Sequence, residues 1–256
     1  MANTQDYRVL VPVDVLGGQD ISRTLVEAFA SVPVVLLGYH EIPDQTAPSQ
    51  AREQFGETAR RKLADHESVF EDAGCDVTSK LVFTHRRLKT FERTAVMLDC
   101  DAVLVLNPAP VLERMLIAIR GEVNVERIAR LVAAILADTE IAVTLFHVVA
   151  DETDREQGED LVETARGALV DAGVDRALID SQVIVDRSPT EAILDAATEY
   201  DLAVVGESRP SIRRFVFRDR AKKIAKRTAD PVLVVRGDYL DEPAEDIELP
   251  GDETFV

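Results

Sequence analysis

The residues whose types most clearly suit ligand binding form a basic cluster between positions 209 and 227. Arginine can hold a phosphate or a carboxylate through two parallel hydrogen bonds, and lysine adds a mobile positive charge. Asp219 is the only acid in this stretch, although the whole chain has 47 acidic and 29 basic residues. Two interpretations stay open: a basic helix that pairs with acidic neighbours, or a site for a nucleotide, a phosphate or an acidic protein surface. The basic members are Arg209, Arg213, Arg214, Arg218, Arg220, Lys222, Lys223, Lys226 and Arg227.

Other reactive residue types give weaker indications. His40 and His147 end two corresponding apolar runs, where they could face a ligand or serve as structural histidines, and His85 ends a third run. The four histidines and two cysteines have no metal-ligand spacing. The chain also lacks a Walker loop, a nucleophile elbow and a Cys-x-x-Cys pair. We therefore expect no metal site and no enzymatic activity.

An internal repeat positions these residues. The runs RVLVPVD at 8–14, VVLLGYH at 34–40, DAG at 72–74 and DAVLVL at 101–106 recur in the same order and at nearly constant offset. The recurring segments are RMLIAIR at 114–120, AVTLFH at 142–147, DAG at 171–173 and DLAVVG at 201–206.

Each copy alternates short apolar runs with helix-like stretches, which is typical of a parallel sheet covered on both faces. The predicted strands lie near 8–13, 33–39, 77–83, 102–106, 115–119, 141–148, 182–185, 202–205 and 231–235. The predicted helices lie near 20–30, 49–73, 88–99, 123–137, 157–172, 189–199 and 217–228, with Ser188 capping the one at 189 and Pro189 at its first position.

The predicted fold class is therefore α/β, with two doubly wound, Rossmann-like parallel-sheet lobes. The first lobe, 1–110, lacks the last helix and strand of the second lobe, 111–237, and an acidic tail follows at 238–256. We expect the lobes to pack closely, and we expect the strand edge of the first lobe to be covered, because an exposed edge invites aggregation. The sequence does not say what covers it.

The order of elements resembles the universal stress protein family. The residues that carry the resemblance are RVLVPVD at 8–14, HVV at 147–149, DLAVVGES at 201–208 and ADPVLVVR at 229–236. The acidic two-copy form is similar to haloarchaeal members. The resemblance implies a five-stranded parallel sheet between helices, commonly paired through its last strand. It also implies a stress-response or regulatory role.

Some members of this family bind ATP through glycines after the fourth strand, with an aspartate at the end of the first strand. Glycines allow backbone N–H groups to approach phosphate oxygens. Here Gly206 stands at the first glycine position, whereas Arg209 and the pair Arg218-Asp219 stand at later ones. Copy one keeps Asp14 but has Leu106, and copy two has Arg120 in place of Asp14, so neither copy holds the whole pattern. The candidate nucleotide or anion site is Asp14, Arg120, Val148, Gly206, Ser208, Arg209, Arg218, Asp219 and Arg220.

The bulk composition limits partners and location. A net charge of −18 disfavours nucleic acid and is typical of adaptation to a salty cytosol. No apolar run is long enough to span a membrane, no secretion signal begins the chain, and Cys75 and Cys100 are expected to be reduced, so we expect a cytoplasmic protein. We expect partners through self-association, lobe pairing or another protein.

Three hypotheses about the function remain. The first is a non-enzymatic stress-response module with a degenerate nucleotide site and a basic anion-binding cluster. The alternative is a stress protein that binds ATP or another adenine nucleotide with slow or no hydrolysis. The third is a relative of electron-transfer flavoproteins, which a colourless preparation would contradict. No cofactor is assigned by the sequence, and an adenine nucleotide is the one that the resemblance implies.

Overall fold

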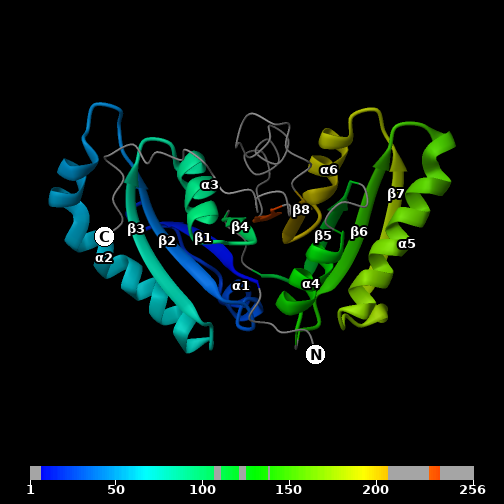
Figure 1. Cartoon of the computed structure of the whole chain (residues 1–256), viewed down its shortest axis with the longest axis horizontal. Coiled ribbons are helices and arrows are strands. Elements are labelled where there is room, and N and C mark those ends of the chain that lie inside the picture. The colour runs from blue at the N-terminus through cyan, green and yellow to red at the C-terminus, as the bar shows by residue number, and fades with distance from the viewer. Residues whose placement is uncertain (1–6, 107–110, 121–124, 138, 207–230, 237–256) are drawn as a thin grey trace.

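The computed structural model describes residues 7–106, 111–120, 125–137, 139–206 and 231–236. Nine strands of these residues form one continuous sheet in the order β3-β2-β1-β4-β9-β8-β5-β6-β7 (Figure 1). The predicted α/β architecture with two parallel arrays is confirmed, and the arrays share a single sheet. None of the described helices is both long and apolar enough to cross a membrane.

The first lobe consists of four parallel strands with three helices. Strands β1, β2 and β4 are mostly buried and read as apolar runs in the sequence, whereas β3 is buried only in its second half. In chain order the elements are β1 (Val9–Asp14), α1 (Arg23–Ala28), β2 (Val34–Glu41), α2 (Pro48–Asp72), β3 (Val77–Thr84), α3 (Arg87–Met97) and β4 (Ala102–Val105).

The second lobe repeats this order and adds one strand. Its elements are β5 (Arg114–Ile119), α4 (Val125–Ile135), β6 (Ala142–Val149), α5 (Arg155–Asp171), β7 (Ile179–Val185), α6 (Pro189–Ala197), β8 (Leu202–Gly206) and β9 (Val232–Val235). Strand β7 begins three residues before the prediction, because its first half carries exposed polar residues on a sheet edge. The helix predicted near 217–228 lies outside the described residues.

Strand β9 joins the two lobes. It pairs in parallel with β8 on one side and antiparallel with β4 on the other. The edge left open by the short first lobe is therefore covered by the last strand of the second lobe, which answers the question that the sequence left open. The close packing expected of the lobes is confirmed.

The antiparallel pair sets the direction of the two arrays. Ala102 is opposite Val235 and Val105 is opposite Val232, so β4 ends beside the start of β9. Gly206, at the end of β8, is opposite Val235. The strands of the two lobes consequently run in opposite directions, so their carboxyl ends lie on opposite sides of the sheet, viewed along the strands.

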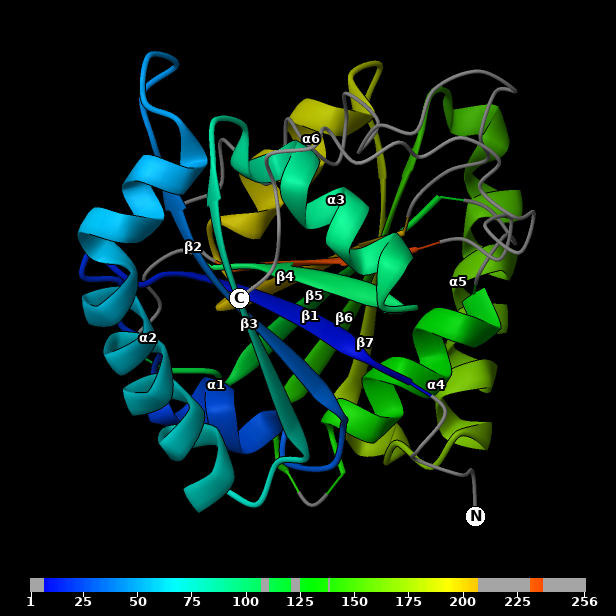
Figure 2. The ribbon, with the colours of Figure 1, turned by 60° about the vertical axis from the view of Figure 1, so that its left-hand side comes forward.

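Helices cover both faces of the sheet (Figure 2). One core contains the inward residues of α1, α2, α4 and α5, and it runs across both lobes. The other core contains those of α3 and α6. Because the first core includes side chains from both arrays, the lobes are not separate hydrophobic units.

Equivalent polar contacts occur in the two lobes. The Asp101 carboxylate accepts a hydrogen bond from Arg8 N at 2.7 Å, and the equivalent Asp201 accepts one from Arg114 N at 2.8 Å. Each aspartate therefore ties the start of the fourth strand of its lobe to the start of the first. The Arg127 guanidinium of α4 also donates to Asp101 at 2.5 Å, across the lobe boundary.

Candidate functional site

Ligands of doubly wound sheets bind where the strand order reverses, outside the carboxyl ends of the strands. The first lobe reverses between β1 and β4, and the second lobe reverses between β5 and β8. These two crevices are the places to test, and the predicted residues Asp14 and Gly206 lie at their respective ends. The two crevices open at opposite ends of the sheet along the strand direction. Asp14 and Gly206 therefore cannot combine into one site within the chain.

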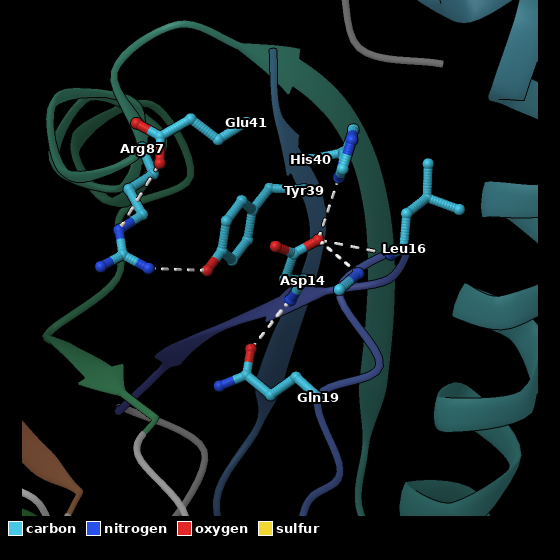
Figure 3. A network of polar contacts seen from close by, with 8 residues as sticks. Asp14, Leu16, Gln19, Tyr39, His40, Glu41 and Arg87 are labelled. Atoms are coloured by element: carbon cyan, nitrogen blue, oxygen red, sulfur yellow. Dashed lines mark hydrogen bonds and ion pairs between the residues drawn. The ribbon is translucent and has the colours of Figure 1, made fainter. Parts of the chain in front are cut away.

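In the first lobe, Asp14 is held by its own loop (Figure 3). Its Oδ1 atom accepts hydrogen bonds from Leu16 N at 3.3 Å and from Gly17 N at 3.0 Å. A Cβ atom at position 17 would lie 2.6 Å from Asp14 Oδ2, so the loop needs glycine there. The Gly17-Gly18 turn thus wraps the carboxylate of Asp14.

A glutamine side chain bridges the mouth of the first-lobe crevice. Gln19 Oε1 accepts a hydrogen bond from Asp14 N at 2.9 Å, and Gln19 Nε2 donates to Leu106 O at 3.3 Å. Leu106 directly follows β4, so the amide spans the gap between the carboxyl ends of β1 and β4. The Gln19 side chain therefore crosses the mouth of this crevice. Sequence reasoning missed Gln19, because nothing in its local sequence marks a partner 87 residues away.

The two strand-end histidines are structural. His40 Nδ1–H donates to Asp14 Oδ1 at 3.2 Å, and its ring packs edge-on against Phe55 and Phe83. His147 Nδ1–H donates to Ile119 O at 2.8 Å. In both lobes the histidine thus ties β2 or β6 to the end of the first strand, as the structural interpretation predicts.

The basic residues after β3 also contact their own lobe. Arg87 donates to Tyr39 Oη at 3.5 Å, and its Nε atom lies 4.0 Å from Glu41 Oε2. Burial raises the pKa of Tyr39, which keeps its hydroxyl protonated. His85 Nδ1–H donates to Ile42 O at 3.2 Å. These contacts hold α3 to the end of β2.

In the second lobe, the three described candidate residues lie at the carboxyl ends of β5, β6 and β8. Arg120 follows β5, is exposed and takes part in a polar or charge contact. Val148, near the end of β6, is half-buried and packs against the second core. Gly206 ends β8, and a Cβ atom there would lie 3.1 Å from Ile128 Cδ1, so a larger residue would require the end of the Ile128 side chain on α4 to shift.

The remaining candidates, Ser208, Arg209, Arg218, Asp219 and Arg220, lie outside the described residues, as does the rest of the basic cluster. Ser188, the predicted cap of α6, is its N-cap residue with Pro189 next, but its side chain makes no capping hydrogen bond. Its backbone N–H instead donates to Asp186 Oδ1 at 2.6 Å. Within the described residues, no group of three or more His, Cys, Asp or Glu side chains could hold a metal ion.

Several solved structures share the fold of the whole chain. A universal stress protein from Archaeoglobus fulgidus DSM 4304 aligns with a TM-score of 0.59 at 14% identity, covering 92% of this chain and 98% of that one. A functionally unknown protein from Pseudomonas aeruginosa PAO1 aligns with a TM-score of 0.51 at 14% identity, covering 94% and 96%. The cytoplasmic domain of a prokaryotic cation chloride cotransporter aligns with a TM-score of 0.51 at 13% identity, covering 89% and 94%.

The sequence comparisons give a family match in the second lobe. No curated protein matches the chain significantly. The model of the Universal stress protein family matches residues 112–236, which comprise the second lobe. At 13–14% identity the structural matches show a common fold rather than a common function. Residues 112–236 therefore match the universal stress protein family, and the chain as a whole has the two-lobed α/β fold of the Archaeoglobus protein.

Proposed function

We propose that the whole chain is a tandem universal stress protein that acts as a non-enzymatic binding module, with one usable crevice, in the second lobe. The observation that carries this proposal is the difference between the two crevices. Gln19 bridges the first crevice from Asp14 N to Leu106 O, and the loop amides hold the Asp14 carboxylate. The second lobe has Arg120 in place of that aspartate and keeps Gly206 at the end of its fourth strand.

The chemistry proposed for the second crevice is anion binding. Arg120 is a cation at the end of β5, and the basic cluster at 209–227 follows β8 directly in the sequence. Arginine forks suit phosphate oxygens, whereas bulky side chains at glycine positions prevent the close backbone approach of an ATP loop. The proposed ligand is therefore a phosphate-bearing molecule, gripped by side chains. An adenine nucleotide is the first to test, with Val148 in contact with its base.

The proposed origin and location of the protein follow from its net charge. A chain with a net charge of −18 suits a salty cytosol, and this supports a haloarchaeal, cytoplasmic member of the family. The arrangement at the strand ends supports a binding role rather than catalysis, because Asp14, His40 and His147 serve there as structural hydrogen-bond partners.

Isothermal titration tests the proposal. ATP, ADP and inorganic phosphate are titrated into the wild-type chain, the double variant Arg209→Ala/Arg218→Ala and the variant Asp14→Ala. Loss of two charge-assisted contacts is expected to weaken binding by at least about tenfold. Asp14→Ala is expected to leave the affinity unchanged, because the first crevice takes no ligand.

A matched control separates site effects from net charge. Arg60→Ala/Arg61→Ala removes two exposed arginines from α2 of the first lobe and should bind like the wild type. Binding that fails for Asp14→Ala but persists in Arg209→Ala/Arg218→Ala would reject the second-lobe site. No measurable binding of any of the three anions would reject the anion-binding function.

A further inference from the structure

A cavity lies apart from both crevices, between α1 with the segment before it and the second half of α2. Its volume is about 250 Å³. Its apolar lining includes Ile21, Val26 and Phe70, of which Val26 and Phe70 belong to the core of the first lobe. The polar contacts described above for the two crevices involve none of these residues. The cavity is therefore a separate feature of the first lobe.

The wall of this cavity contains a histidine where an apolar residue is expected. Gly56, Ala59, Leu63 and Phe70 are the buried positions of α2, and their spacing of three, four and seven residues places position 66 in the same stripe. His66 occupies that position and lines the cavity. Among the described residues its ring has no hydrogen-bond partner. His66 is half-buried, so its ring nitrogens are available to a ligand that enters the cavity.

The charge state of this histidine defines what it can bind. Burial lowers the pKa of His66, against the opposing effect of Asp20 and Asp65 and with the help of Lys62. The imidazole is consequently neutral at pH 7 and offers one N–H donor and one nitrogen acceptor. It can accept a hydrogen bond from a cationic N–H group.

The charged residues around the cavity favour a cation. Asp20 comes from the segment before α1, and Asp65 comes from α2, so carboxylates lie on both walls. Lys62 is the one basic residue of the lining. A ligand that carries a positive charge therefore meets two carboxylates and one ammonium group. The apolar part of the lining requires that the ligand also has a hydrocarbon body.

We propose that this cavity binds a small organic cation. Its ammonium group lies between Asp20 and Asp65 and donates an N–H to His66, and its apolar body packs on Ile21, Val26 and Phe70. The volume is below the usual range of about 300–1,000 Å³ for ligand pockets, which limits the ligand to a single ring or a short chain. This site is independent of the anion site proposed in the second lobe.

Titration with 2-phenylethylamine, followed by NMR of the histidine ring signals, tests this site. The chain has four histidines, so His66 is assigned from the signal that is absent in His66→Gln. We expect the amine to shift the His66 signal with a dissociation constant of about 1 mM, as suits a ligand of this size. The isosteric 2-phenylethanol, which has no charge, should bind at least about fivefold more weakly.

Charge variants on α2 complete the test. Asp65→Asn should weaken binding of the amine roughly tenfold, whereas Asp72→Asn, an exposed change on the same helix outside the cavity, should leave it unchanged. Both substitutions are at exposed positions, and circular dichroism checks that the fold is kept. The proposal is overturned if the amine leaves the His66 signal in place, if the alcohol binds equally well, or if the two variants bind alike.

Discussion

Asp14 shows how neighbours decide the role of a residue. A carboxylate at the end of a first strand can hold a nucleoside only when its oxygens are available. Here Oδ1 of Asp14 accepts hydrogen bonds from Leu16, Gly17 and His40. The residue type and position were readable from the sequence, but the hydrogen bonds that Oδ1 accepts depend on a turn and on a histidine 26 residues away. Gln19 could not be predicted for the same reason.

The two cysteines give a prediction at the same scale. Burial raises the pKa of Cys75 to about 11 and that of Cys100 to about 12. Because a thiol reacts as the thiolate, raised values keep both groups protonated and unreactive between pH 7 and about 9. We expect Ellman's reagent to modify neither thiol of the native chain at pH 8, and both after unfolding in guanidinium chloride. Rapid modification of the native chain would contradict the burial of these residues.

At the scale of elements, Gly158 sets how closely α5 packs on the sheet. A Cβ atom at Gly158 would lie 2.8 Å from Val149 Cγ1 and 2.9 Å from His147 Cδ2, whereas one at Gly167 would meet nothing within 4 Å. Gly158→Ala should therefore lower the free energy of unfolding by about 1–3 kcal/mol through overpacking. Gly167→Ala, on the same helix, should raise it by about 0.5–1 kcal/mol through helix propensity. Urea unfolding measures both, and equal effects of the two substitutions would contradict the packing of α5 on β6.

The elements also show where sequence reasoning succeeds. Strands such as β1 and β5 are apolar along their whole length because both faces are covered, so they were predicted closely. Strand β7 was predicted too short because residues 180–182 are exposed at the sheet edge. The four residues of β9 were predicted as a strand, but their antiparallel pairing with β4 is a property of the whole sheet and leaves no local pattern.

At the scale of the molecule, β9 and the residue after it lock the lobes together. The Arg236 guanidinium donates to Ala95 O at 3.0 Å and to Cys100 O at 2.5 Å, both in the first lobe. Since β9 completes both arrays and one core runs through both lobes, the chain should unfold as a single cooperative unit.

Replacing Arg236 tests this cooperativity. Arg236→Ala should destabilise both lobes together, by about 1–3 kcal/mol, because it removes charge-assisted hydrogen bonds to carbonyl groups. Arg23→Ala, which removes an exposed ion pair with Glu27 on α1, should change the stability by less than about 0.5 kcal/mol. Calorimetry should give one transition for each protein. Two separate transitions in the wild-type chain would show that the lobes are independent.

The two lobes share one architecture, but we propose that only the second has a crevice available to a ligand. Hydrogen-exchange mass spectrometry with and without saturating ATP tests it most directly. We expect slower exchange on ligand addition in the segments that end β5, β6 and β8, near 117–120, 146–149 and 203–206. We expect no change in the first-lobe segment 14–19. Protection confined to 14–19, or no protection in either lobe, would show that the second-lobe crevice does not bind ATP.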